Sequence, residues 1–408
     1  MKYFFSICII YLLIIFSLFP YIQIIPLGTD SQPNALIIAL CLFPFCCKWK
    51  MNKNLTLLLL LAIIAFILLF ISPLNFGSIR SLVNYISLFV ITYVTYFSLK
   101  KIRGIPYSLF KAIIWIWFLV GTIQLFINPD FMSFLIPRGN SAHTLETGRG
   151  IVCLAPEPTF YGITCLFLVL FTHLNFKNEP KVNRLYLLLG IQILLYSRSS
   201  LAIFILLVSV GLYFALNFFN KKYFFKIIVV LILISFTIFI ILNKYSDQIS
   251  TYRVGKLLSL AVESPQTVLL LDASTNERFV HIFFPIYGCL ENYFLPHGYE
   301  DFQYFMEKCF NTKKFSDLFT PYLLSNPIIR IMSGWGSLFY ELGAFGLLLI
   351  IVFYNSISSV YQGKTRIMIL AIIGMLLMNA IPFSNPIIPF YIGNLLYKKE
   401  TMNHESYN

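Results

Sequence analysis

Long apolar runs recur along almost the whole of this 408-residue chain and constrain its fold more than any other feature. An α-helix needs about 20 apolar residues to cross the hydrocarbon core of a bilayer. Only 12% of the residues are charged, against about 25% in soluble domains, which is too little charge to cover a water-soluble surface. The sequence therefore predicts an all-α polytopic membrane protein and excludes cytosolic enzymes, disulfide-rich secreted domains and disordered chains.

Twelve segments are candidate membrane spans. The second, seventh and twelfth are short, and residues 184–217 can be read as one bent helix, so about 11–12 spans are expected. The first resembles a signal peptide, but no small-residue cleavage site follows it, so an uncleaved span is expected. The candidates are residues 3–24, 34–47, 54–72, 83–99, 108–128, 151–173, 184–197, 199–217, 225–243, 335–356, 366–382 and 385–397.

Positive charges alternate between successive connections, and this alternation predicts the orientation. Every second connection carries two or three lysines or arginines, whereas those near Asp30, Arg80 and Ser384 carry almost none. Short cytoplasmic loops are enriched in Lys and Arg. The pattern is unbroken only if residues 184–217 form two spans, which places both termini in the cytoplasm. The net charge of +13 fits basic cytoplasmic loops better than nucleic-acid binding.

Two longer connections are expected on the outer side, at about 129–150 and 244–333. The predicted organisation is N-terminal spans over 1–243, a large outer loop over 244–333, C-terminal spans over 334–397 and a cytoplasmic tail over 398–408. The large loop is rich in Tyr, Phe, Asn and Asp, so any chemistry is expected on the outer face. Of the eight cysteines, only Cys289 and Cys309 fall in this loop, where a disulfide between them could form.

Arginine is concentrated on the predicted outer side, where topology does not require it. A guanidinium binds phosphate oxygens bidentately and stays charged, so an anionic ligand would explain these residues. Anchoring to lipid headgroups and ion pairs with outer carboxylates is the simpler alternative. The outer set holds seven of the ten arginines: Arg80, Arg138, Arg149, Arg198, Arg253, Arg278 and Arg330.

A carboxylate stands between two prolines where the sixth span is expected. Glu157 follows Pro156 and precedes Pro158, and the pattern places it a turn or two inside the span, with Arg149 at the entrance. A charge at this depth is costly unless it is paired or faces a polar cavity. Proline removes backbone donors and opens a helix, so a pocket lined by Glu157 is expected, with a purely structural Arg149–Glu157 ion pair as the alternative.

Three further polar positions are candidates for the outer site. Arg198 lies among three serines at the turn between the seventh and eighth spans, where a polar tip is needed in any case. His297 has glycine and acidic neighbours and could act as a general base, although a surface histidine is the plainer interpretation. Glu341 is expected about two turns inside the tenth span.

Nucleotide and metal motifs are not found in the sequence. There is no P-loop, no GxGxxG, no HExxH, no Cys/His spacing for zinc and no DxD. No cofactor and no metal are therefore expected, and a sugar-nucleotide donor is disfavoured.

Taken together, these residues resemble the Wzy-type O-antigen polymerases, a family related to the O-antigen ligases. The shared features are an arginine–glycine pair followed by P-E-P-T, an outer S-R-S turn, a large late loop and an E-L-G-x-x-G span. The resemblance covers most of the chain as architecture. Its residues are Arg149, Gly150, Pro156, Glu157, Pro158, Thr159, Arg198, Arg278, Glu341, Leu342, Gly343 and Gly346.

The resemblance implies an enzyme of the bacterial inner membrane that acts in lipopolysaccharide or related surface polysaccharide biosynthesis. It would polymerise undecaprenyl-pyrophosphate-linked oligosaccharide units on the periplasmic side. A hydroxyl of one lipid-linked unit would attack the anomeric carbon of the donor chain, which leaves its lipid pyrophosphate. A metal-independent glycosyltransferase is therefore expected, with a chain-length regulator as a candidate partner.

That reaction needs three kinds of group. Arg149, Arg198 and Arg278 are the candidates for stabilising the pyrophosphate charge. Glu157, His297 and Glu341 are the candidate bases. Aromatic faces could bind sugars, with Tyr161 and Tyr299 as the chosen residues, although the loop aromatics could equally form a small core. These loop aromatics are Tyr252, Tyr287, Tyr293, Phe294, Tyr299 and Tyr304.

Two alternative functions stay open. O-antigen ligases typically have a histidine shortly before the E-L-G segment, where this chain reads Ser333–Gly334–Trp335–Gly336–Ser337, which favours a polymerase. A lipid-linked oligosaccharide flippase is expected to show internal repeats and ionisable groups near the membrane midplane. No repeat is evident here, and the charges gather toward one face.

Overall fold

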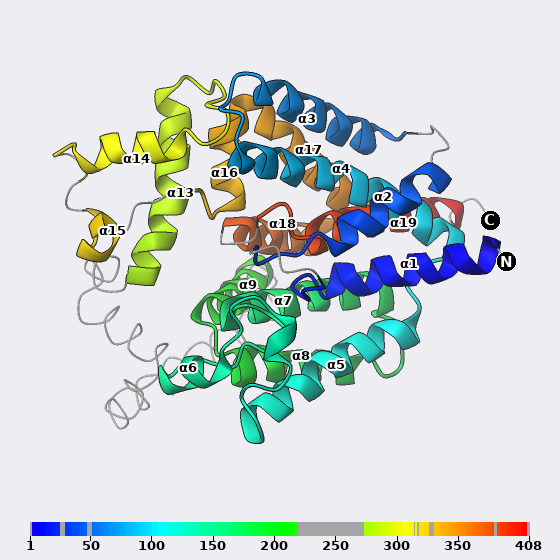
Figure 1. Cartoon of the computed structure of the whole chain (residues 1–408). Helices are drawn as coiled ribbons and strands as arrows, with labels where there is room; N and C mark the ends of the chain where they lie inside the picture. The colour runs from blue at the N-terminus through cyan, green and yellow to red at the C-terminus, as the bar shows by residue number, and fades with distance from the viewer. Residues whose placement is uncertain are drawn as a thin grey trace.

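The computed structural model is a bundle of helices with a smaller helical group at one end (Figure 1). The structure describes residues 2–24, 29–46, 51–218, 273–313, 315, 318–325, 330–378 and 382–405. These residues form helices, turns and loops and contain no β-strand. The prediction of an all-α chain is confirmed for this part of the protein.

The first half of the chain builds one side of the bundle. Its helices are α1 (Lys2–Leu18), α2 (Asn34–Cys46), α3 (Lys53–Leu69), α4 (Phe76–Ile102) and α5 (Tyr107–Phe126). α4 packs against α2, α3 and α19 (Ile387–Glu405), so it runs through the interior. Asparagine side chains cap two of these helices: Asn52 accepts from the amide of Leu55 and Asn75 from that of Ser78. Such caps fix where a helix begins.

The second half supplies the remaining helices. After η1 (Ser133–Leu135) and α6 (Ser141–Glu146) come α7 (Pro158–Phe176), α8 (Val182–Ile191), the π-helical turn η2 (Gln192–Ser197) and α9 (Ser200–Phe218). The C-terminal part holds α16 (Gly334–Leu342), the 3₁₀ turn η4 (Gly343–Gly346), α17 (Leu347–Ser358), α18 (Gly363–Met378) and α19. Arg198 has a left-handed backbone between η2 and α9, so residues 184–217 form two helices.

Among the residues that the structure describes, five helical elements are long and apolar enough to cross a membrane: α4, α5, α7, α9 and the α16–α17 segment Gly334–Ser358. Several such helices indicate a membrane protein. Eleven of the twelve expected segments coincide with helices, and the remaining one, 225–243, lies outside the described residues.

The expected start of the sixth span is wrong. Residues 151–157 are not helical, and α7 begins only at Pro158. Glu157 is the residue before the helix, with an extended backbone (φ −147°, ψ 157°). A proline disfavours helical backbone in the residue before it and fits well at the first position of a helix, so the two prolines delay the helix to Pro158.

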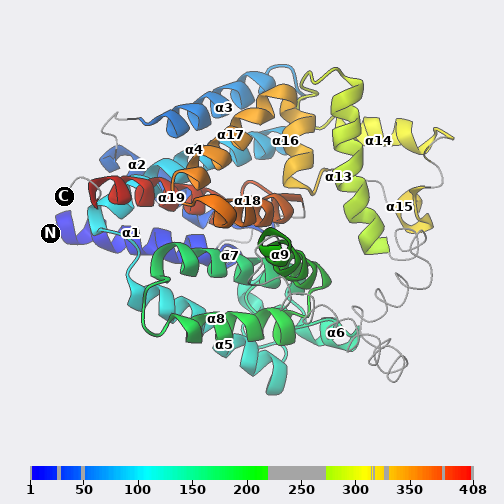
Figure 2. The same cartoon turned by 180° about the vertical axis from the view of Figure 1, so that it is seen from behind.

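The smaller group comprises α13 (Ala273–Glu291), α14 (Phe302–Phe310) and α15 (Pro321–Ser325), with a core of its own. It lies at the end of the molecule opposite both chain termini (Figures 1 and 2). These helices belong to the expected large loop, of which residues 244–272 lie outside the described part. Cys289 and Cys309 are buried here as free thiols, so the disulfide considered from the sequence is not formed.

Candidate functional site

A cavity of about 370 Å³ lies between the start of α4, the end of α16 and the segment that precedes α14. Loop residues 29–33 and 382–386 complete its wall. The cavity is mainly apolar but contains two arginines and three carboxylates. Its charged lining residues are Asp30, Arg80, Glu300, Arg330 and Glu341.

A second cavity of about 310 Å³ adjoins the first, since Asp30, Phe160, Arg330 and Met332 line both. Its wall brings together the start of α7 and one face of α13. The charged residues around it are Asp30, Arg138, Glu157, Glu277, Arg278 and Arg330. Residues far apart in the sequence therefore concentrate charge at this end of an otherwise apolar bundle.

Glu157 reaches the second cavity because the segment before α7 is held in an irregular, non-helical path that turns at Cys153. The side-chain amide of Gln124 on α5 binds this segment through its oxygen and its nitrogen. Oε1 accepts from the amide of Cys153 at 2.8 Å, and Nε2 donates to the Cys153 carbonyl at 3.0 Å. Ser141 donates to Gln124 Oε1 and accepts from the amide of Val152. Buried non-helical backbone needs such partners, and these place Glu157 at the cavity wall.

Arg149 pairs with Glu157, with 3.7 Å between Nη2 and Oε2. The sequence predicts this pair, but along a helix, whereas the two residues lie at either end of the non-helical segment before α7. Both side chains are partly exposed, so the pair leaves the carboxylate accessible from the cavity.

Gly150 allows the close approach that this arrangement needs. The amide of Ile151 donates to the carbonyl of Tyr196, and a Cβ on Gly150 would overlap the carbonyls of Tyr196 and Ser197. We expect Gly150→Ala to lower the yield of folded protein and the thermal midpoint, because backbone must move to accept the methyl group. Gly190→Ala is the matched control, since nothing lies within 4 Å of its Cβ. Equal midpoints for the two variants would contradict this role.

One face of α13 presents Ser274, Glu277, Arg278 and His281 to the second cavity, at spacings of three and four residues. Burial raises the pKa of Glu277, and the nearby charge of Glu157 adds to the effect. Arg278 lines the same cavity as Glu157 and Glu277, so its positive charge stands beside two carboxylates.

His281 is neutral in the folded protein. Burial, aided by the charge of Arg330, lowers its pKa to about 4, and its Nδ1 accepts from the amide of Met332. Because the folded pKa lies below the unfolded value near 6.5, stability is complete above about pH 6.5 and falls as the pH drops toward 4. We expect the thermal midpoint to fall over this window and the fall to be smaller in His281→Gln. An equal slope in both proteins would contradict the assignment.

Glu341 stands at the end of α16 and lines the first cavity. The hydroxyl of Tyr85 on α4 donates to its Oε2 at 2.5 Å. This bond orients the carboxylate in the wall of the cavity.

Arg80 and Arg330 share the first cavity with Glu341. Burial lowers the pKa of Arg330, and the positive charge of Arg80 lowers it further. An arginine stays charged at any physiological pH, so two guanidiniums face one space, where the carboxylates of Asp30 and Glu300 offset part of their repulsion. A doubly charged oxyanion would relieve this repulsion, and guanidiniums bind such groups through paired hydrogen bonds.

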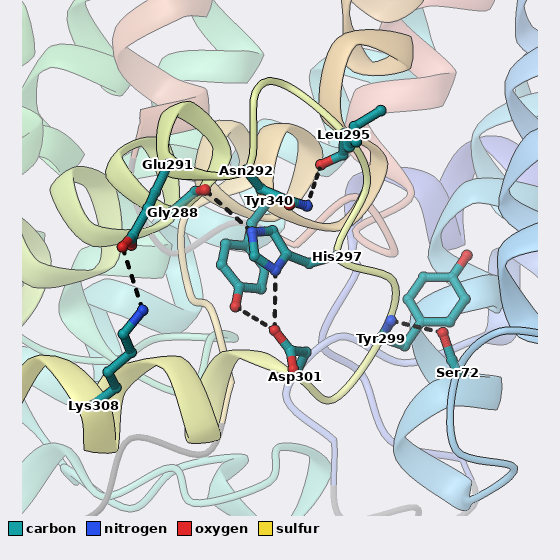
Figure 3. Close-up of polar contacts among 10 residues, drawn as sticks. All are labelled: Ser72, Gly288, Glu291, Asn292, Leu295, His297, Tyr299, Asp301, Lys308 and Tyr340. Atoms are coloured by element: carbon teal, nitrogen blue, oxygen red, sulfur yellow. Dashed lines mark hydrogen bonds and ion pairs between the residues drawn. The ribbon is translucent and has the colours of Figure 1, made fainter.

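Five predicted site residues do not line either cavity, and one of them, Arg149, reaches the wall of the second cavity through its pair with Glu157. Tyr161 is buried, stacks on Trp117 and donates to Gln192. Tyr299 is buried and donates to the carbonyl of Ala65. Arg198 donates to the carbonyl of Leu195. His297 is held by three protein partners (Figure 3).

The other loop aromatics divide between core and surface. Tyr287 packs against the small core of the α13–α15 group, whereas Tyr293 and Tyr304 are exposed. Tyr252 lies outside the described residues. Sugar-binding faces are thus available on this surface but not at Tyr161 or Tyr299. Among the described residues, no three His, Cys, Asp or Glu side chains are grouped as for a metal ion.

No protein-family model matches the chain, and no curated protein matches it. The site is therefore interpreted from its geometry and from the sequence motifs.

The fold brings into the site several residues that the sequence motifs did not single out. Arg80 and Arg330 were recognisable only as members of the outer arginine set, because nothing in the sequence pairs positions 250 residues apart. Glu300 and Asp30 are isolated acidic residues in loops. His281 looks like part of an amphipathic helix, and only the spacing of Ser274, Glu277 and Arg278 could have linked it to them.

Proposed function

We propose that this protein is an O-antigen polymerase that joins undecaprenyl-pyrophosphate-linked oligosaccharide units at the periplasmic face of the bacterial inner membrane. The observation that carries the proposal is the pair of adjoining cavities, which gather arginines and carboxylates at one end of an apolar helical bundle. That end is remote from both chain termini (Figure 1), in accord with termini in the cytoplasm and chemistry outside.

The chemistry requires no cofactor. The hydroxyl oxygen of the acceptor sugar forms a bond to the anomeric carbon of the donor while the bond from that carbon to the diphosphate oxygen breaks. The diphosphate keeps the electron pair, and its growing charge is stabilised by guanidiniums already in place. Arg80 and Arg330 in the first cavity and Arg278 in the second suit this role.

The proton of the attacking hydroxyl passes to a carboxylate. Glu341 is the best placed of the three bases expected from the sequence, because it lines the cavity that also holds Arg80 and Arg330. Glu157 lines the second cavity and pairs with Arg149, which suits a role in binding. His297 uses both ring nitrogens for protein contacts and is a poor candidate.

The deciding experiment is the gel profile of surface lipopolysaccharide from a strain that lacks this gene, with and without the gene restored. Core bearing a single repeat unit in place of a ladder is the expected result. Bare core with polymer still built on the lipid carrier would instead identify a ligase. Bare core with unpolymerised units held on the cytoplasmic side would identify a flippase.

Restoring the gene as Arg278→Ala or Arg149→Ala tests the binding roles within the same assay. We expect shorter and scarcer polymer, by about tenfold or more, because each change removes positive charge beside the second cavity. Unchanged polymer length and amount in both strains would show that neither arginine contacts the pyrophosphate.

A further inference from the structure

His297 lies at the centre of a compact group of polar contacts that the proposed chemistry leaves unexplained (Figure 3). Its Nδ1 lies 3.0 Å from Asp301 Oδ2 and its Nε2 lies 3.1 Å from the carbonyl oxygen of Gly288. The imidazole stacks on the ring of Tyr340, with 4.1 Å between centroids and 5° between planes. The hydroxyl of Tyr340 donates to the same Asp301 oxygen at 2.7 Å.

These contacts determine what the histidine can do. A carbonyl oxygen only accepts, so Nε2 must carry a hydrogen and donate it to Gly288. The other nitrogen faces the Asp301 carboxylate, which Tyr340 also contacts. Both ring nitrogens and one ring face therefore contact protein groups. A histidine held in this way joins two segments of the protein and is poorly placed to carry a proton.

Backbone bonds join the same two segments. The amides of His297 and Gly298 donate to the carbonyls of Tyr340 and Glu341, and the amide of Ala344 donates to the carbonyl of Phe294. The last carbonyls of a helix have no partner within it, so the 292–301 loop completes the end of α16. Gly343, at φ +57°, permits this contact, because a Cβ there would overlap the Phe294 carbonyl.

The joined segments also carry cavity carboxylates. Glu300 lies between His297 and Asp301 in the sequence, and Glu341 directly follows Tyr340. Glu300 has a left-handed backbone (φ +64°), and its carboxylate packs against Gly77 at the start of α4, where a Cβ would overlap it. Glu341 receives the Tyr85 hydroxyl from the same helix.

We propose that His297, Asp301 and Tyr340 form a positioning clamp that fixes the 292–301 loop on α16 and so sets Glu300 and Glu341 in the first cavity. The clamp residues act through these carboxylates and not on the substrate. The catalytic consequence rests on the proposed function, whereas the structural consequence does not.

The structural consequence is tested by the accessibility of Cys289, which is buried beside Gly288 and whose carbonyl accepts from the amide of Phe294. Burial raises the pKa of this thiol, so its reaction with maleimide should be slow in the wild-type protein. The purified full chain in lipid nanodiscs is treated with N-ethylmaleimide, and labelling is read at each cysteine by mass spectrometry. Asp301→Ala should label Cys289 about 10- to 100-fold faster, because lost hydrogen bonds favour opening of the loop.

Lys308→Gln is the matched control, because it breaks the exposed Lys308–Glu291 ion pair between α14 and α13 and leaves the three clamp residues unchanged (Figure 3). Its Cys289 should label at the wild-type rate. If Asp301→Ala also labels within twofold of wild type, the loop does not depend on the clamp and the proposal is wrong.

The catalytic consequence is tested by the rate of polymer formation in the same nanodiscs with lipid-pyrophosphate-linked oligosaccharide. Asp301→Ala should lower kcat about 10- to 100-fold with little change in KM, because a misplaced carboxylate slows chemistry more than binding. Asp301→Asn keeps an oxygen that accepts from the Tyr340 hydroxyl and adds an N–H that can donate to Nδ1 of His297, so it should recover most of the rate. In a Glu341→Gln background, Asp301→Ala should add little further loss.

Each remaining outcome is decisive. Equal losses in Asp301→Asn and Asp301→Ala would mean that the hydrogen bonds at this position do not support the rate, which overturns the clamp. Additive losses with Glu341→Gln would mean that the clamp does not act through that carboxylate. If the wild-type chain makes no polymer, the proposed function fails, and the labelling of Cys289 alone decides whether the clamp exists.

Discussion

Replacing Glu341 with glutamine should reduce polymer formation by about 10²- to 10⁴-fold while leaving the protein folded. The amide keeps the shape of the side chain and can still accept from Tyr85, but it cannot take the proton of the attacking hydroxyl. The measurement is the initial rate of polymer formation by the full chain in nanodiscs, with the thermal midpoint recorded in parallel.

Two further variants test whether the loss of rate comes from the carboxylate of Glu341 itself. Glu307→Gln alters an exposed carboxylate of α14 that lies outside both cavities and should keep the wild-type rate. Tyr85→Phe removes the hydrogen bond that orients Glu341 and should cost only several-fold. A wild-type rate for Glu341→Gln would assign the base elsewhere, with Glu157 as the next carboxylate to examine.

Loss of Arg330 should have the largest effect among the arginines, because its side chain lines both cavities. We expect Arg330→Ala to reduce polymer formation by about 10²- to 10³-fold, the usual cost of removing one donor to a developing negative charge. The rate of polymer formation by Arg330→Lys should lie between those of the wild type and Arg330→Ala, since lysine keeps the charge but not the planar pair of donors.

A binding measurement separates this effect from a loss of folding. Inorganic pyrophosphate should bind the wild-type chain measurably more tightly than Arg330→Ala, and added salt should weaken binding to both. Arg184→Ala, at the exposed start of α8, is the matched control and should bind as the wild type does. Equal affinity in Arg330→Ala and Arg184→Ala would remove Arg330 from the proposed site.

The helices were predictable from the sequence because a helix that crosses a bilayer needs a long apolar run. In the described residues, these runs coincide with helices. The start of the sixth span was not predictable from hydropathy. Residues 151–155 are as buried as a span should be, yet the amides of residues 151–153 donate to Tyr196, Ser141 and Gln124 instead of to a preceding helical turn. Only the two prolines pointed to this, and they were interpreted as an opening within the helix.

The candidate site was predicted in part for a related reason. Glu157, Arg278 and Glu341 carry charge next to apolar segments, which is a local signal, and each lines a cavity. The partnership of Arg80 with Arg330 depends on tertiary packing alone. His297 looked like a base because its neighbours are polar, but those same neighbours bind both of its nitrogens.

The amide of Gln124 has a consequence for how such chains can diverge. It makes two donor and two acceptor contacts, to Phe131, Cys153 and Ser141, and is fully buried. Asparagine carries the same amide on a shorter side chain, and no other residue type offers two donors and two acceptors in one plane. Substitution at position 124 should therefore be accompanied by changes at position 141 and in the length of the 151–157 segment, so these positions should covary as a unit among relatives of this chain.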